Sequence, residues 1–127
     1  METQGIVSLL GRIGLALIFI VSGWGKLMHP EGAAGYMQAM NVPTLLLWPT
    51  IALELLGGIA LVIGVQTRIL GWLFALFCVL SAVLFHANFG DQGQQVNFMK
   101  NIAMAGGFLI LAANGAGALS WDARRAR

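Results

Sequence analysis

The chain has 127 residues, of which 58% are hydrophobic and 9% are charged, and its mean hydropathy is +0.81. This composition excludes an ordinary soluble domain, in which about a quarter of the residues are charged. The formal net charge of +2 does not indicate a nucleic-acid partner, because three of the seven basic residues are Arg124, Arg125 and Arg127 at the tail, where they favour anionic lipid headgroups.

Four apolar segments each reach the length of about 20 residues that an α-helix needs to cross the hydrocarbon core of a membrane. We place these spans at about residues 5–27, 44–65, 67–88 and 96–114. Lipid offers no partner to backbone N–H and C=O groups, so the segments are predicted to be helices. The first segment is expected to be retained, because no small-residue cleavage motif of a signal peptide follows Lys26.

The segment at about 30–41 predicts a short helix between the first two spans. Pro30 followed by Glu31 favours a helix start, and Pro43 ends the segment. Residues 64–67 predict a tight hairpin, and the polar residues 89–95 predict a loop. The expected fold class is therefore all-α: one domain over 1–127, an integral membrane antiparallel four-helix bundle with a short interfacial helix.

The distribution of Lys and Arg predicts the orientation of the bundle. With four spans both termini share one side, which holds Arg68, the arginines of the tail and nearby Arg12, against Lys26 and Lys100 on the other side. Basic residues concentrate on the cytoplasmic side. We therefore expect a multi-pass protein of the cell inner (cytoplasmic) membrane, with both termini in the cytoplasm.

Glu54 lies near the middle of the second apolar segment. A carboxyl at such a depth costs about 2.5–3.5 kcal/mol on insertion scales, so it needs a proton, a cationic partner or a watery pocket. If residues 5 and 65 lie at the same level, Arg12 and Glu54 differ in depth by about 6 Å. We therefore expect an Arg12–Glu54 pair inside the bundle. This pair is either a structural ion pair or a site that engages a proton or polar ligand, unless the two charges are neutralised separately.

A second group of polar residues is expected near the opposite surface. Its members are Lys26, His86, Asn88, Asn97, Lys100 and Asn101. Together these donors and one imidazole suit an oxygen-rich head group or a proton relay, although the lysines also suit headgroup contacts and the histidine suits a wet helix end. No His/Cys spacing typical of a metal site is present, and the lone Cys78 cannot form a disulfide within the chain.

In their order and spacing, several short motifs resemble the DoxX family over almost the whole chain. They are Arg12, Ser22-Gly23-x-x-Lys26-Leu27 with Pro30, Glu54 before Gly57-Gly58, Gly64-x-x-Thr67-Arg68, His86, Asn97-Phe98-Met99-Lys100-Asn101-x-Ala103 and Gly115-x-Gly117-x-x-Ser120-x-Asp122. The resemblance implies a four-helix protein of the prokaryotic cytoplasmic membrane. It further implies an oxidoreductase component, with relatives in quinone-coupled sulfur oxidation or oxidative-stress complexes.

These observations lead to one main functional hypothesis and two alternatives. The main hypothesis is the membrane subunit of a redox system, in which Glu54 and His86 accept protons. Its substrate, for which a quinone is the candidate, is bound by Lys26, Lys100, Asn101 and Arg12. The chain carries no cofactor motif of its own, so a partner oxidoreductase would supply the redox group. The alternatives are a small-solute or lipid-binding transporter and a membrane scaffold that recruits partner proteins. Besides the lipid bilayer, a second copy of this chain is a further candidate partner.

Overall fold

The computed structural model describes residues 2–88 and 90–126, and no strand occurs among them. Four of their helical stretches are long and apolar enough to cross a membrane: Thr3–Met28, Thr44–Ile63, Thr67–Phe85 and Gln92–Asn114. The predicted fold class, all-α with four membrane-length helices and a short helix after the first, is confirmed. The described residues form two compact units, residues 2–66 with 116–126 and residues 67–115 without 89.

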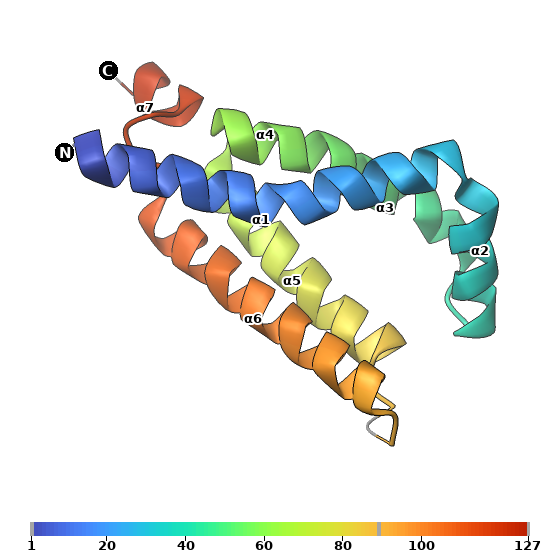
Figure 1. Ribbon diagram of the computed structural model, residues 1–127. Helices are drawn as coiled ribbons and strands as arrows, with labels where there is room; N and C mark the ends of the chain where they lie inside the picture. Colours follow the sequence, from blue (N-terminus) through green and yellow to red (C-terminus); the bar gives the residue numbers. More distant parts are fainter. Residues whose placement is uncertain (1, 89, 127) are drawn as a thin grey trace. The chain divides into compact units, whose positions relative to one another are not determined.

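The first unit is built on two antiparallel helical stretches (Figure 1). The first stretch is the long helix α1, and the second is a run of short helical segments that follow one another without a break. The elements of this unit are α1 (Glu2–Met28), α2 (Pro30–Ala39), the 3₁₀ turn η1 (Thr44–Leu46), α3 (Leu47–Ala52), the π-helix η2 (Leu53–Gly57), α4 (Gly58–Ile63) and α7 (Trp121–Arg125).

Close approach between α1 and the second stretch depends on residues without side chains. A Cβ atom on Gly23 would lie 3.0 Å from the backbone nitrogen of Leu55, and one on Gly58 would lie 2.6 Å from Cγ1 of Ile20. In membranes, small residues of this kind let helix backbones pack closely. The contact of Gly23 with Leu55 sets the register in which the two stretches run past each other.

α4 ends in a left-handed glycine. Gly64 has φ of +86°, and its N–H donates to the Ala60 carbonyl at 2.7 Å, while the N–H of Val65 donates to the same carbonyl at 2.9 Å. Glycine is the usual residue at this position because a side chain is strained there. The predicted hairpin at 64–67 therefore begins with a helix C-cap.

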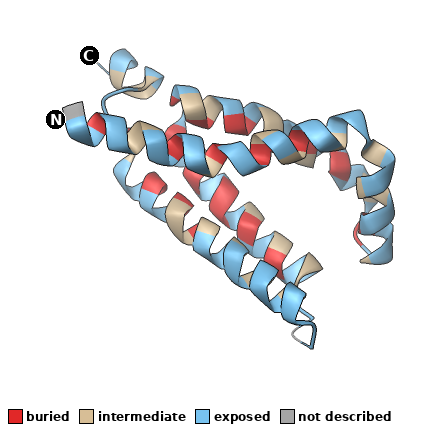
Figure 2. Ribbon diagram, in the orientation of Figure 1, coloured by how far each residue is buried: buried red, intermediate tan, exposed pale blue. Residues whose placement is uncertain are grey.

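The second unit is a hairpin of α5 (Thr67–Phe85) and α6 (Gln92–Asn114). Phe74 and Phe108 are fully buried and stacked, with ring centroids 5.0 Å apart. Figure 2 shows buried positions along α5 and on the C-terminal half of α6. A Cβ atom on Gly71 would lie 2.9 Å from the Ala112 nitrogen, so the two backbones are close here. α6 begins at Gln92, before the predicted start of the span at 96, because the Asp91 side chain accepts the Gly93 N–H at 2.9 Å.

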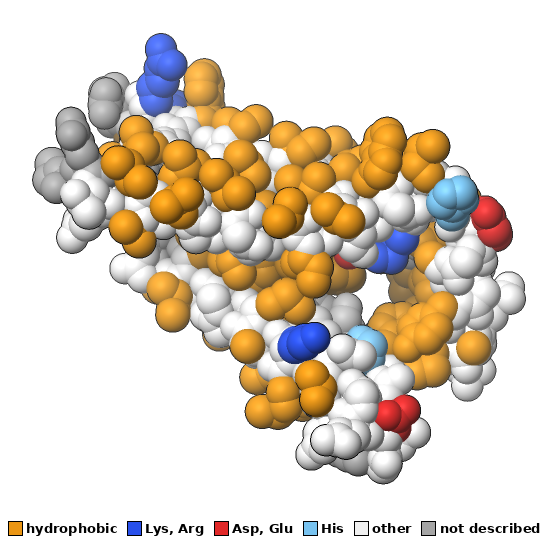
Figure 3. Space-filling view, in the orientation of Figure 1, with side chains coloured by type: hydrophobic (Ala, Val, Ile, Leu, Met, Phe, Trp, Pro, Cys, Tyr) orange, Lys and Arg blue, Asp and Glu red, His pale blue; other side chains and the backbone are white. Residues whose placement is uncertain are grey.

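The outer surfaces of the spans are apolar. Hydrophobic side chains cover most of the visible face of α1 (Figure 3). Large apolar residues on this helix are exposed, among them Leu10 (62%), Leu17 (58%) and Val21 (62%). A water-soluble helix would present polar side chains at such positions. These surfaces are suited to lipid.

Candidate functional site

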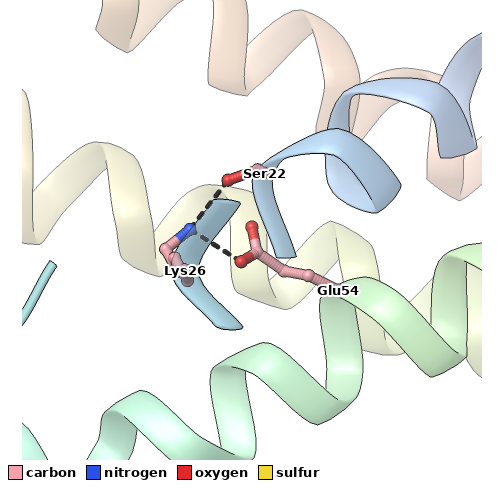
Figure 4. A network of polar contacts seen from close by, with 3 residues as sticks. All are labelled: Ser22, Lys26 and Glu54. Carbon is pink, nitrogen blue, oxygen red and sulfur yellow. Dashed lines mark hydrogen bonds and ion pairs between the residues drawn. The ribbon is translucent and has the colours of Figure 1, made fainter. Parts of the chain in front are cut away.

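Lys26, Ser22 and Glu54 meet in the first unit. The Lys26 ammonium nitrogen Nζ lies 2.7 Å from Oε1 of Glu54 and donates a second hydrogen bond of 2.8 Å to Oγ of Ser22 (Figure 4). Ser22 and Lys26 stand one turn apart on α1, so both side chains lie on the same face, while Glu54 comes from η2. The site thus joins the two antiparallel stretches of the unit.

The two charges differ in their exposure. The Glu54 side chain is 4% exposed and the Lys26 side chain is 27% exposed. A short bond between ionised partners is stronger than a neutral one, and the pair removes the isolated charge that a buried carboxylate would otherwise carry. Glu54 is therefore held in the interior by a lysine that is itself partly accessible.

The site keeps unused hydrogen-bonding capacity. An ammonium group has three N–H donors, and the described contacts of Lys26 use two of them. The second carboxylate oxygen of Glu54 receives no bond in this network (Figure 4). A polar ligand that reaches Lys26 can accept a hydrogen bond from its third N–H without breaking the ion pair.

The backbone around Glu54 is irregular. Residues Leu53–Gly57 form a π-helix between α3 and α4. Such single π turns are rare and occur often at functional sites, because they widen the helix and change the direction of a side chain. The π turn lies directly against the part of α1 that carries Gly23.

The predicted Arg12–Glu54 pair is wrong. Gly23 lies against Leu55, so Glu54 stands level with Gly23, about eleven residues or 16 Å along α1 from Arg12. The prediction placed residues 5 and 65 at the same level, which moved Glu54 several residues too far toward the start of α1. The cation that neutralises Glu54 is Lys26.

Arg12 instead binds backbone carbonyls. It is 1% exposed, and its guanidinium donates to the carbonyls of Leu61 at 2.9 Å and Val62 at 2.8 Å and to that of Leu119. The last carbonyls of a helix lack partners within it and carry the negative end of its dipole. Arg12 therefore caps α4 and ties the segment before α7 to it, while its predicted substrate binding stays a prediction.

The second unit contains the other predicted site residues. His86 directly follows α5, and its Nδ1 lies 2.7 Å from Oε1 of Gln94. Asn101 donates to the Asn97 carbonyl at 3.1 Å, and Lys100 is exposed on α6. Lys26 belongs to the first unit, and its grouping with these residues stays a prediction. Among the residues that the structure describes, no cluster of three His, Cys, Asp or Glu side chains suits a metal ion.

Sequence reasoning missed the role of Ser22 and the partner of Glu54. The spacing of Ser22 and Lys26, four residues apart, was a usable signal for one shared face. The pairing with Glu54 required the helix register, which depends on the contact between Gly23 and Leu55.

The helix α7 was also not predicted from the sequence. The Ser120 side chain caps its start by accepting the Ala123 N–H at 3.1 Å. Of the predicted basic tail, Arg127 lies outside the described residues.

Comparisons with known proteins agree with this architecture. The chain is 44% identical over 122 residues to "Inner membrane protein YqjF" of Escherichia coli (strain K12), covering 96% of this chain and 92% of the relative. It is 37% identical over 126 residues to "Inner membrane protein YphA" of the same strain, covering 94% of this chain and 90% of the relative. These relatives and the four candidate spans support a multi-pass inner membrane protein.

A further relative has a name that refers to chemistry. "Putative oxidoreductase CatD" of Bacillus subtilis (strain 168) is 37% identical over 71 residues, covering 56% of this chain and 53% of the relative.

No solved structure matches the chain. The DoxX family model matches residues 7–87, which include the α1–η2 site and α5. The chain therefore belongs to the DoxX family.

Proposed function

We propose that this protein is the membrane subunit of a redox system that binds a quinone at the Lys26–Glu54 site and works with a partner oxidoreductase. The observation that carries the proposal is a buried carboxylate held at 2.7 Å by a partly exposed lysine with a spare donor. Ionisable groups inside a membrane span are costly and commonly mark proton or substrate sites. The name of the Bacillus subtilis relative is consistent with this function.

The chemistry of a quinone suits these two side chains. Reduction of a quinone to its quinol consumes two electrons and two protons, and negative charge develops on the carbonyl oxygens as the electrons arrive. In the proposal, Lys26 donates a hydrogen bond to one of these oxygens and stabilises that charge. Glu54 delivers protons to the site by accepting and releasing them. The electrons come from the partner oxidoreductase.

Residues of the second unit extend the proposal. His86 uses Nδ1 for its contact with Gln94, and in the proposal its other ring nitrogen, Nε2, accepts a proton. Within this unit, Lys100 and Asn101 are the proposed hydrogen-bond donors for quinone oxygens. In this proposal both termini lie in the cytoplasm, because the arginines Arg68, Arg124 and Arg125 are then on the side where basic residues concentrate.

The proposal is tested by quinone binding to purified protein. Wild-type protein is prepared in mild detergent, its bound quinones are identified by mass spectrometry, and the affinity for an added short-chain quinone is measured. We expect Lys26→Met to weaken binding by about tenfold, the value of one hydrogen bond to a charged donor. Glu31→Gln serves as the control, because this carboxylate is exposed on α2.

Two results would contradict the proposal. One is wild-type protein that retains no quinone and binds none when it is added. The other is an affinity that Lys26→Met and Glu54→Gln leave at the level of the Glu31→Gln control.

A further inference from the structure

A cavity of about 320 Å³, open to the surface, lies where α7 meets the turn after α4, and its lining includes neither Lys26 nor Glu54. Its volume is at the lower end of the range of about 300–1,000 Å³ that is usual for small-molecule sites. All its lining residues belong to the first unit. They are Val65, Gln66, Trp121, Asp122, Arg125 and Ala126.

Hydrogen bonds hold the two walls of this cavity together. The Asp122 N–H donates to the Gly64 carbonyl at 2.9 Å, and the Gln66 N–H donates to Oδ1 of Asp122 at 2.8 Å. The Ser120 side chain caps the start of α7. The short helix is thereby fixed to the end of α4, so the cavity exists before any ligand binds, which lowers the cost of binding.

Of the two charged side chains that line the cavity, Asp122 has polar partners and Arg125 has none among the described residues. The Asp122 carboxylate accepts the Gln66 N–H and interacts electrostatically with Arg12. The Arg125 guanidinium has no hydrogen bond or ion pair with any other described residue, and the residue is exposed. Among the described residues, the lining of the cavity therefore includes a guanidinium without a hydrogen-bonded partner, and the indole of Trp121 also lines it.

The position of the cavity matches the headgroup layer of a membrane. α4 ends at Ile63, the second membrane-length stretch ends there as well, and α7 follows beyond it. Tryptophan is enriched at this level, where its ring meets both apolar chains and water. A guanidinium binds phosphate oxygens through paired N–H donors. A ligand with a phosphate group and an apolar body would use both side chains.

We propose that this cavity binds the phosphate headgroup of a membrane phospholipid. Arg125 donates to the phosphodiester oxygens, and the ring of Trp121 packs against the glycerol and the first carbons of the acyl chains. Gln66 supplies an additional polar group at the rim. The site is independent of the proposed quinone chemistry.

Arg124 provides a matched control for Arg125. Both arginines are exposed in the last turn of α7, but only Arg125 lines the cavity. Basic residues near a membrane surface attract anionic lipids without any defined site. Arg124→Gln and Arg125→Gln remove this general attraction equally, so the difference between them measures the cavity.

The experiment is native mass spectrometry of delipidated full-length protein titrated with phosphatidylglycerol. We expect Arg125→Gln to raise the apparent Kd at least fivefold and Arg124→Gln to raise it less than twofold. Ala126→Phe fills the cavity and keeps both charges, and it is expected to raise the Kd at least fivefold as well. Circular dichroism confirms that each variant is folded.

Three outcomes would overturn this proposal. The first is equal weakening by Arg124→Gln and Arg125→Gln, which would mean attraction to the tail without a site. The second is a wild-type protein that binds no phosphatidylglycerol. The third is full displacement of the lipid by inorganic phosphate at millimolar concentration, which would mean that the cavity takes a free anion. None of them bears on quinone binding at Lys26.

Discussion

Breaking the Lys26–Glu54 pair should destabilise the protein in a way that depends on which partner is removed. Lys26→Met removes the ammonium group and keeps the length of the side chain, so Glu54, 4% exposed, is left without its counter-charge. Removing one partner of a buried pair costs about 3–5 kcal/mol. Because Lys26 is 27% exposed, we expect the lower end, a loss of about 3 kcal/mol in the free energy of unfolding.

Glu54→Gln should cost less than Lys26→Met. The amide oxygen still accepts a hydrogen bond from Lys26, and the lysine can extend its stem toward the membrane surface. The expected loss is about 1 kcal/mol, the value of an ordinary hydrogen bond. The double variant has no buried charge left unpaired, so we expect it to lose about 2 kcal/mol, less than the sum of the single losses of about 4 kcal/mol.

The assay is reversible unfolding in mixed detergent micelles, followed by circular dichroism, for the wild type, both single variants and the double variant. The cycle should give a coupling energy of about 2 kcal/mol. Glu31→Gln combined with Lys26→Met is the control, and its effects should add because Glu31 is exposed. Additive effects of Lys26→Met and Glu54→Gln would refute the reasoning, since they would mean that the ion pair contributes nothing.

Other predictions concern the packing that surrounds the site. Arg12→Lys keeps the charge but cannot span three carbonyls, so the free energy of unfolding should fall by about 3 kcal/mol; an unchanged value in the same assay would contradict the capping role. Gly23→Ala places a Cβ 3.0 Å from the Leu55 nitrogen and should cost about 1–3 kcal/mol. In Gly25→Ala the added Cβ meets nothing within 4 Å, so this control should be neutral or stabilising by up to about 1 kcal/mol. Similar losses in the free energy of unfolding for Gly23→Ala and Gly25→Ala would count against the close approach of α1 to Leu55. Cys78 is fully buried, so a maleimide should label it only after denaturation, and rapid labelling of folded protein would disprove this packing.

Hydrophobic length was sufficient to predict the helices. Each apolar segment was long enough to cross a membrane. Backbone N–H and C=O groups in lipid must be hydrogen-bonded within the segment, so these segments were expected to be α-helices. The sequence also pointed to the short helix after α1, because proline at a first helical position followed by an acidic residue is a local signal. The helix α7 was not predicted, since its five residues depend on a serine cap and on contacts with distant residues.

The partners of the charged residues could not be predicted from depth alone. A difference of a few residues in helix register changes which cation reaches Glu54, and the register depends on Gly23 lying against Leu55. Arg12 could bind either a carboxylate or backbone carbonyls, because the carbonyls at the end of a helix accept hydrogen bonds from a guanidinium. The π turn around Glu54 likewise depends on packing and leaves no simple sequence pattern.

Photoaffinity labelling with an azido-quinone tests the central claim most directly. The probe is bound to purified protein, cross-linked by light, and located by mass spectrometry of the peptides. Binding at the Lys26–Glu54 site predicts adducts on the part of α1 near Lys26 and on Leu53–Gly57, with labelling strongly reduced by Lys26→Met. Adducts that lie elsewhere on the chain, with the same yield in Lys26→Met as in the wild type, would contradict the account.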